Sequence, residues 1–330
     1  MAEHWEKYSY SVDMESETTA TKVLRLIGEN KRVLELGSAV GSMTRLMKEN
    51  NGCTVVAMEL DPAMARMAEP YCERMVVGNV ESMDLDAAFG EDRFDVIVAA
   101  DILEHLYDPW ACLRKIRKFL RPEGYLVISV PNVAHNALLA QLLSGRFPYQ
   151  EKGLLDRTHL RFFTRLNLQD MLLSSGYLPA RWERNTVAES ATEFGCDWEK
   201  TPDRLRQSLA DNPDGQTYQF IVQAYPSTET GWAAKTHEDL RREQVARQKL
   251  ENELSQLKSD FAVYQKAFDE TSKAFNEARQ LLEQRQKTID EQMEHQKALQ
   301  ETRAILETIQ RKPFAYAIKQ FGARLAKKIK

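Results

Sequence analysis

Short runs of β-branched and other apolar residues alternate with helix-length segments along the first two thirds of the chain, and this alternation restricts the possible folds more than any other feature. The runs are rich in Val and Ile and are bounded by Gly, Asp or Pro, as is typical of buried strands. The predicted strands lie at 33–36, 54–59, 74–77, 94–99 and 125–130. The helix-length segments lie at 43–49, 62–69 and 109–120. Strands separated by helices form βαβ units, so the sequence predicts an α/β fold with a mostly parallel sheet.

Two later runs, 178–184 and 217–225, are expected to complete the sheet as a pair of strands at its edge. The stretch between them, 188–215, is rich in polar and turn-forming residues. This composition predicts an insertion or a mobile loop.

The composition changes near residue 236. From there to residue 310 the chain contains no Pro and no Gly, and charged residues are dense. Apolar residues recur at every seventh position, at Leu254, Phe261, Phe268, Phe275, Leu282 and Ile289. This heptad repeat predicts a long α-helical coiled coil over 236–311, after a linker at 227–235. It favours a homo-oligomer over a solitary solvated helix, because such a helix would leave the apolar stripe in water.

The last segment, 312–330, contains no acidic residue. Pro313 is expected to end the preceding helix. Four apolar residues then fall on one helical face, at Phe314, Ile318, Phe321 and Leu325. A basic amphipathic helix of this kind suits an anionic membrane surface. A solvated tail, or a helix that docks on a partner protein, remains the alternative.

Charge is divided unevenly along the 330 residues, whose formal net charge is −4. Residues 227–330 contain 20 Lys and Arg against 16 Asp and Glu, so residues 1–226 carry a net charge of −8. An acidic first part argues against nucleic acid as its main partner.

No segment is long and apolar enough to span a bilayer, and the first residues do not resemble a signal peptide. We expect a cytoplasmic protein whose basic tail allows peripheral attachment to the inner membrane.

The first strand leads into a turn between two glycines, Gly37 and Gly41. Glycine lets a ligand lie against the backbone of a strand-to-helix turn, because it has no Cβ atom. Glu35 precedes the first glycine by two residues, and Glu59 ends the next predicted strand. A carboxylate at the end of that strand can accept hydrogen bonds from both hydroxyls of a bound ribose.

These residues resemble the first motif of the class I S-adenosylmethionine (SAM)-dependent methyltransferases. The resemblance covers about residues 20–225 and implies a Rossmann-like, doubly wound domain at 1–226 with SAM as cofactor. It also implies that Glu35 lies near the amino-acid end of the cofactor, that Gly37 and Gly41 line the turn, and that Glu59 holds the ribose.

Two positions depart from the family pattern. Ala39 stands where the family usually has a glycine, a replacement that is tolerated if its φ angle is negative. Asn79 stands where an Asp near the adenine is common, and its amide can still hydrogen-bond to the adenine edge.

Two further segments, 94–109 and 120–132, resemble later motifs of the same family, in the expected order. The competing reading is a nicotinamide-dependent dehydrogenase, which requires G-x-G-x-x-G at the turn. Neither Ser42 nor Met43 supplies the last glycine of that pattern. The motifs therefore favour the methyltransferase.

The segment 132–165 is expected to form a lid on the acceptor side of the cofactor, and Asp101 and His105 are expected to face the acceptor as well. Within it, 153–164 resembles an element of bacterial methyltransferases associated with surface polysaccharides and other glycans. This resemblance implies a sugar hydroxyl of a bacterial or lipid-linked glycan as the acceptor. A small molecule methylated on oxygen or nitrogen is the alternative, and a coiled-coil assembly protein with a vestigial methyltransferase fold is a second one.

Methyl transfer from a sulfonium is an in-line displacement for which we expect no metal, although an acceptor hydroxyl must lose its proton. His159 and His135 are the candidate bases, and Asp101 and Asp156 are their candidate partners. His159 has the alternative role of bracing the lid, and His105 is expected to be structural. Arg157 and Arg161 either bind an acidic acceptor or pair with nearby acids such as Glu151.

Overall fold

The structure is a computed structural model that describes residue 12 and residues 15–290, with side chains as far as residue 282. The chain divides into two compact units, residues 1–240 and residues 241–330. The first unit contains a sheet and the helices that cover it. In the second unit, all described residues belong to one helix, α10.

The first unit is built on a seven-stranded sheet with the order β3-β2-β1-β4-β5-β7-β6. Strands β1 to β5 run parallel, whereas β7 pairs antiparallel with both β5 and β6. The predicted Rossmann-like fold and the pair of strands that completes the sheet are therefore confirmed. The strands are β1 Arg32–Leu36, β2 Thr54–Glu59, β3 Arg74–Val77, β4 Phe94–Ala100, β5 Leu120–Pro131, β6 Tyr177–Thr186 and β7 Thr217–Pro226.

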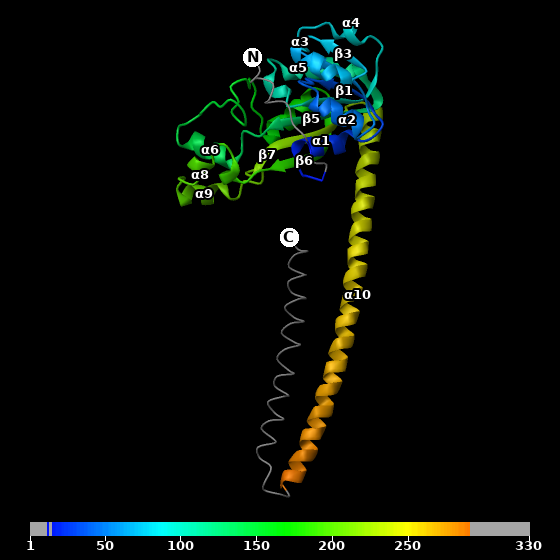
Figure 1. Cartoon of the computed structure of the whole chain (residues 1–330), viewed down its shortest axis with the longest axis vertical. Coiled ribbons are helices and arrows are strands. Elements are labelled where there is room, and N and C mark those ends of the chain that lie inside the picture. Colours follow the sequence, from blue (N-terminus) through cyan, green and yellow to red (C-terminus); the bar gives the residue numbers. More distant parts are fainter. Residues whose placement is uncertain (1–11, 13–14, 291–330) are drawn as a thin grey trace. The chain divides into compact units, whose positions relative to one another are not determined.

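Helices cover both faces of this sheet, because successive side chains of a buried strand point to opposite faces. In β1, Val33 packs in one apolar cluster with residues of α1 and α2, whereas Leu34 packs in another with residues of α4, α5 and α7. Figure 1 shows α1, α2, α4 and α5 around the strands. The helices are α1 Thr19–Ile27, α2 Ser42–Glu49, α3 Pro62–Ala68, α4 Leu85–Phe89, α5 Pro109–Ile116 and α7 Arg165–Ser174.

The polar stretch 188–215 is a folded insertion rather than the mobile loop that its composition also allowed. It contains the short helices α8 Gly195–Trp198 and α9 Asp203–Leu209, which lie beside α6 Asn136–Leu143 (Figure 1). Phe194 is buried in a small core with Leu138 and Leu155. One buried aromatic ring thus ties the insertion to the predicted lid, an interaction that polar composition does not reveal.

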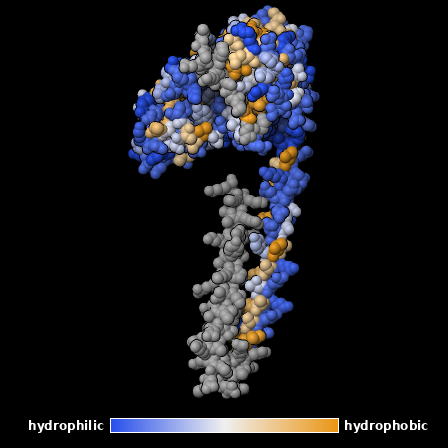
Figure 2. Space-filling model, in the orientation of Figure 1, coloured by the Kyte–Doolittle hydropathy of each residue, from blue (hydrophilic) through white to orange (hydrophobic). Residues whose placement is uncertain are grey.

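Helix α10 spans Glu229–Asp290, so the predicted linker at 227–235 is wrong for most of its length. Thr228 caps the N-terminus of this helix. Its side chain accepts a hydrogen bond from the Gly231 N–H, and its carbonyl accepts one from the Trp232 N–H. Apolar side chains recur among hydrophilic ones along α10 (Figure 2), and Leu254 and Phe268 are about half exposed. Self-association through this stripe stays a prediction.

Two sequence predictions fall on the remaining residues. The end of the predicted coiled coil, 291–311, and the predicted basic helix, 312–330, lie outside the described residues. None of the helices in the described part of the chain has both the length and the apolar character that a bilayer-spanning segment needs.

Candidate active site

A cavity of about 1470 Å³ lies at the carboxyl ends of the parallel strands. Its wall contains residues that follow β1, β2, β3 and β4, and residues near the end of β5. Ligands of open α/β sheets bind at this edge, because the loops there converge. The predicted site residues that line this cavity are Glu35, Gly37, Glu59, Asn79, Asp101 and His159.

The turn from β1 to α2 needs glycine at both predicted positions. Gly37 has a φ of +73°, and a Cβ atom there would lie 1.9 Å from Cδ1 of Ile102. Gly41 has a φ of +85°, and a Cβ atom there would lie 2.7 Å from Cα of Ala68. Gly37 therefore lets the cavity wall close on β4, whereas Gly41 lets α2 pack against α3.

Ala39 contradicts the condition under which its substitution for glycine was expected to be tolerated. Its φ is +47°, in the left-handed region, not negative. This conformation costs a non-glycine residue about 1–2 kcal/mol. The Ala39 N–H donates a hydrogen bond of 2.7 Å to Oε2 of Glu59, which offsets part of that strain.

Glu59 holds the turn as well as facing the cavity. Its Oε2 accepts from the Ala39 N–H, and its Oε1 accepts from the Asp61 N–H at 2.9 Å. The residue is 8% exposed and lines the cavity. Each carboxylate oxygen has further acceptor capacity, so Glu59 can hold the backbone and two ribose hydroxyls together.

Glu35 is buried at the end of β1 and connects this strand to α2. Oγ1 of Thr44 donates a hydrogen bond of 2.5 Å to Oε2 of Glu35. Burial raises the pKa of Glu35 to about 7, the Thr44 hydrogen bond opposes this shift, and the charge of Glu59 adds to it. A cation bound in the cavity would stabilise the ionised form of Glu35.

Asn79 lies just after β3, in the same wall. Its Oδ1 accepts a hydrogen bond of 2.8 Å from the Glu81 N–H. This bond directs the amide oxygen to its own loop, so the NH₂ group is the part of the side chain suited to a ligand acceptor such as an adenine nitrogen.

The cavity is strongly acidic. Among the described residues, its lining includes eight carboxyl side chains and one Lys or Arg, Lys152. Such a lining favours a cationic ligand and disfavours a phosphorylated one. The eight acids are Glu35, Glu59, Asp61, Glu81, Asp101, Glu104, Asp156 and Glu193.

Asp101 follows β4 and has a φ of +55°. Its Oδ1 accepts hydrogen bonds from Oγ of Ser129 at 2.7 Å and from Nε2 of Gln219 at 2.9 Å. Restricted solvation raises the pKa of Asp101, and these two donors oppose the shift. Both bonds fall on one oxygen, so Oδ2 is the oxygen that remains for a ligand.

The predicted lid reaches the end of β4 through backbone hydrogen bonds. The N–H groups of Leu160 and Arg161 donate to the carbonyl of Glu104, at 2.7 and 2.9 Å. Oδ1 of Asp156 accepts from the backbone and the hydroxyl of Thr158 and so shapes the turn before His159. The ring centroids of His159 and His105 are consequently 4.8 Å apart.

His135 does not join this group. It is fully buried, and its Nδ1 accepts from the Ala137 N–H at the start of α6. Its Nε2 lies 2.9 Å from the carbonyl of Val187, and burial lowers its pKa. Both ring nitrogens are thus used within the fold, and the geometry is that of a helix cap rather than of a base facing an acceptor.

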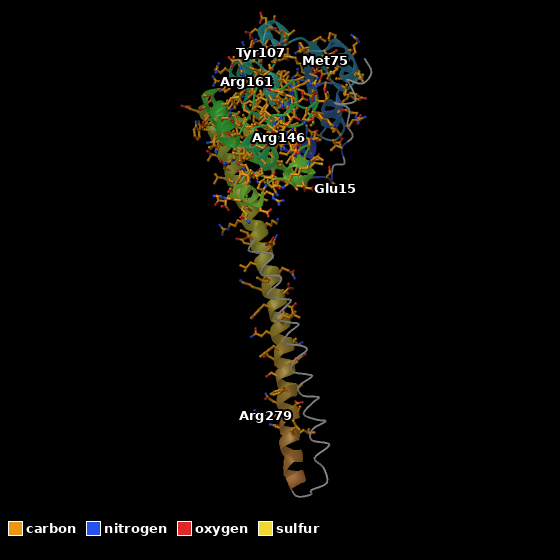
Figure 3. All side chains as sticks on the ribbon, turned by 90° about the vertical axis from the view of Figure 1, so that its left-hand side faces the viewer. Glu15, Met75, Tyr107, Arg146, Arg161 and Arg279 are labelled. Carbon is orange, nitrogen blue, oxygen red and sulfur yellow. The ribbon has the colours of Figure 1, made fainter. Side chains whose placement is uncertain are left out.

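Arg157 and Arg161 have partners within the protein. Arg157 forms an ion pair with Glu151, as one of the two sequence readings expected. Arg161 donates to the carbonyl of Tyr107, beside which Figure 3 shows it. Neither arginine is among the residues that line the cavity.

Comparison with known proteins decides the family. A family model described as a methyltransferase domain matches residues 10–178, which is half of the chain. The chain belongs to this methyltransferase family. It is a SAM-dependent methyltransferase, and SAM is its cofactor.

Two curated relatives and one solved structure are each similar to part of the chain. The ubiquinone biosynthesis O-methyltransferase of Xanthomonas campestris is 27% identical over 176 residues, which cover 49% of this chain and 72% of that protein. The Xanthomonas oryzae protein of the same name is 28% identical over 177 residues, with the same coverage. The CcbJ methyltransferase structure from Streptomyces caelestis has a TM-score of 0.45 at 16% identity and covers 68% of this chain and 96% of that one.

The residues of the methyltransferase cavity fit SAM. Gly37, Ser38 and Ala39 of the turn line the cavity, and the acidic wall suits the positive sulfonium and ammonium groups. Oγ of Ser38 lines the cavity, is buried, and has no hydrogen-bond partner among the described residues. A buried hydroxyl of this kind normally has a partner, which a bound cofactor can provide.

Three cavity residues of the methyltransferase were not found from the sequence. Glu104 lies between Asp101 and the lid, and its carboxyl group is buried. Tyr218 of β7 donates to the carboxylate of Glu193, which also accepts from the Leu154 N–H. Only the pairing of β7 with β5 and the folding of the insertion bring Tyr218 and Glu193 to the lid. The acid-histidine pair at 104–105 was the one signal available in the sequence.

Proposed function

We propose that this methyltransferase methylates a sugar hydroxyl of a bacterial glycan or of a lipid-linked glycan. The supporting observation is that the segment resembling glycan-associated methyltransferases forms a wall of the SAM cavity. Gly153, Asp156, Thr158 and His159 of this segment line the same cavity as Gly37 and Glu59. This supports the proposal, because the element that suggests a glycan lines the cavity rather than a remote surface.

Bound SAM supplies an electrophilic methyl group on a positively charged sulfur. Glu59, Asn79 and the turn after β1 would hold the cofactor, and Glu35 would compensate its positive charge. Alignment of the acceptor oxygen with the methyl group then provides most of the rate acceleration.

We infer that Asp101 takes the proton of the acceptor hydroxyl. Ser129 and Gln219 fix its carboxylate through Oδ1, so Oδ2 is available to the hydroxyl. Asp101 is directly followed by Ile102, whose side chain packs on Gly37 of the cofactor turn. An acceptor bound at Asp101 would lie next to the cofactor, as a displacement reaction requires. His159 belongs to the same acceptor side.

A hydroxylated small molecule is the second candidate acceptor. It is favoured by the relatives named ubiquinone biosynthesis O-methyltransferase, at 27–28% identity. The acidic cavity accepts neutral hydroxyl compounds of either class and disfavours phosphorylated groups near the transferred methyl.

The experiment is a transfer assay with SAM labelled in its methyl group. The purified protein is incubated in parallel with isolated glycan intermediates and with a set of phenolic small molecules. We expect a methyl ether on a sugar hydroxyl, identified by mass spectrometry. Labelled products from the phenols alone would contradict the glycan proposal and select the second candidate.

We also propose that the heptad stripe of α10 joins copies of the chain, and that residues 312–330 attach the assembly to an anionic membrane. The support is the spacing of the apolar residues at 254–289 and the charge of the last segment. Lipid-linked acceptors are found at such surfaces, which makes the attachment useful to the proposed reaction.

A further inference from the structure

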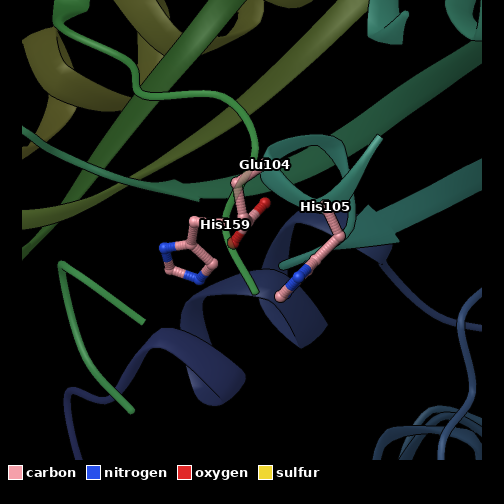
Figure 4. Close-up of side chains that lie close together, drawn as sticks. All are labelled: Glu104, His105 and His159. Atoms are coloured by element: carbon pink, nitrogen blue, oxygen red, sulfur yellow. The ribbon is translucent and has the colours of Figure 1, made fainter. Parts of the chain in front are cut away.

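Three side chains at the acceptor end of the cavity offer one carboxylate and two imidazoles to the same small volume. One ligand atom each of Glu104, His105 and His159 lies within 4.8 Å of the other two. In Figure 4 the carboxyl group of Glu104 is seen between the two rings. Glu104 and His105 come from the turn after β4, whereas His159 comes from the lid.

The carboxyl group of Glu104 has no hydrogen-bond partner among the described residues. The residue is 1% exposed, and neither Oε1 nor Oε2 is bonded, although the residue lines the cavity. Burial raises the pKa of Glu104 well above its usual range, and the charges of Asp101 and Asp156 add to the effect. An unpartnered buried carboxyl group destabilises a fold unless a ligand compensates it.

The two histidines are oriented by carbonyl groups. Nδ1 of His105 lies 3.2 Å from the carbonyl oxygen of Thr158, and Nδ1 of His159 lies 3.4 Å from that of Leu154. A carbonyl oxygen can only accept, so each Nδ1 carries the hydrogen and each Nε2 carries the lone pair. Histidine ligands of metal ions are commonly fixed in this way by a second group on the other ring nitrogen.

We propose that Glu104, His105 and His159 form a binding site for a divalent transition-metal cation such as Zn²⁺, Co²⁺ or Mn²⁺. Two imidazoles and one carboxylate are a donor set that these ions accept, whereas Mg²⁺ prefers oxygen ligands alone. Three protein ligands leave further coordination positions for water or an acceptor oxygen. Asp101 and Asp156 add negative charge nearby, which favours a cation.

Small side-chain movements would bring the three ligand atoms to the distances that a bound cation requires. Ligands 2.0–2.1 Å from a tetrahedral Zn²⁺ lie about 3.3 Å from one another, which is less than the present spread of the three atoms. Rotations that move each atom by about 1 Å close this difference. The cation site goes beyond the proposed function, since it is formed by the protein alone and its test needs neither SAM nor an acceptor.

The test is a metal titration of tag-free, chelator-treated full-length protein. Co²⁺ binding is followed by visible absorption and Zn²⁺ binding by calorimetry, with Mg²⁺ in a parallel titration. Thiolate ligation by one of the cysteines would give an intense near-ultraviolet charge-transfer band, so the Co²⁺ spectrum distinguishes it. Glu104→Gln and His159→Gln each remove one donor, and His237→Gln on α10 is the matched control for non-specific imidazole binding.

We expect one equivalent of Co²⁺ or Zn²⁺ in the wild type and in His237→Gln, without a thiolate band and without competition by equimolar Mg²⁺. The affinity should fall at least about 100-fold in Glu104→Gln and in His159→Gln, while circular dichroism stays unchanged. Equal affinity in all four proteins, or a thiolate spectrum, would overturn the proposal. If one variant fails to fold, the other decides. A SAM titration on the same samples shows separately whether the cofactor site is intact.

Discussion

Cδ1 of Ile102 occupies the space that a side chain on Gly37 would need, since a Cβ atom on Gly37 would lie 1.9 Å from it. The contact joins the cofactor turn after β1 to the loop after β4. Asp101 and Glu104 lie on that same loop and line the same cavity as Gly37.

We therefore expect Gly37→Ala to weaken SAM binding at least about tenfold, because the added methyl group must displace Ile102 and because φ at this residue is +73°. Gly90→Ala is the matched control, since Gly90 has a φ of +53° but no atom within 4 Å of a Cβ atom. The control should lose about 1–2 kcal/mol of stability and bind SAM normally. Isothermal titration measures the SAM affinity of both variants. An equal loss of affinity in the two would mean that backbone strain, and not the contact with Ile102, causes the effect.

Glu59→Ala should weaken SAM binding by about 2–3 kcal/mol, the usual scale for losing charge-assisted hydrogen bonds. Part of the loss arises because the Ala39 and Asp61 N–H groups also lose their acceptor. Asp61→Asn is a suitable control, since Asp61 lines the same cavity but its carboxylate caps α3, which Asn also does. Unchanged SAM affinity in folded Glu59→Ala would rule out the ribose assignment.

The stability of the fold should depend on pH through Glu35. Its folded-state pKa is about 7 against a usual 4.5, so the native state holds this proton more tightly than the unfolded state. Stability should therefore fall as the pH rises from about 4.5 to about 7, by about 3 kcal/mol in total, because each pKa unit corresponds to about 1.4 kcal/mol. Glu35→Gln should remove this dependence and exceed the wild type in stability at pH 8.

Denaturant unfolding at several pH values checks this prediction. Glu91→Gln is the control, because the Glu91 side chain is almost fully exposed. Parallel pH profiles for the wild type and Glu35→Gln would contradict a raised pKa at Glu35.

The sequence predicted the sheet well because its strands carry a local signal. The Val-rich strands at 54–59 and 74–77 have the bounds of β2 and β3. Helix α6 was not predicted, since the run 136–143 is apolar on most sides and begins at His135, which caps it through a ring nitrogen. In the same way, the Thr228 cap was overlooked, and with it the start of α10.

The site residues show the same difference between local sequence signals and tertiary contacts. Gly37 and Gly41 lie in one strand-to-helix turn and Glu59 ends the next strand, so local sequence signals predict a ligand that contains a ribose. Glu104 and His159 are 55 residues apart, and their proximity depends on how the lid hydrogen-bonds to the β4 loop. Sequence patterns do not contain this tertiary contact, so they could suggest His159 but not its neighbours.

His159→Ala should lower kcat while the SAM affinity stays within about twofold, because we propose that His159 lies on the acceptor side. A loss of about 10²–10⁴-fold, the scale of general acid–base catalysis, is expected only if His159 is itself the base. His237→Ala, on the exposed surface of α10, should have no effect on either quantity. Because we assign the base to Asp101, the acid limb of the pH–rate profile should persist in His159→Ala. Loss of that limb would indicate that His159, and not Asp101, is the base. A loss of SAM affinity as large as the loss of kcat would indicate a structural role of His159 in the lid.

The last prediction concerns assembly. Phe268→Lys places a charge in the heptad stripe of α10, so it should reduce the mass measured by sedimentation equilibrium from an oligomer to a monomer. Val263→Lys is the matched control, because Val263 is also apolar and exposed on α10 but lies outside the heptad positions. The control should keep the wild-type mass, and a monomeric wild type would contradict self-association.

Vesicle binding should follow the oligomeric state. A basic residue near an anionic surface contributes about 1 kcal/mol, so one copy of residues 312–330 binds weakly and several linked copies bind more tightly. Deleting 312–330 should release the protein from anionic vesicles in a co-sedimentation assay, and Phe268→Lys should weaken binding although the tail is present. Both variants should still methylate a soluble acceptor, because the SAM cavity is built from residues 12–219. Wild-type protein that stays in the supernatant at low salt would contradict the membrane proposal and favour a protein partner for the tail.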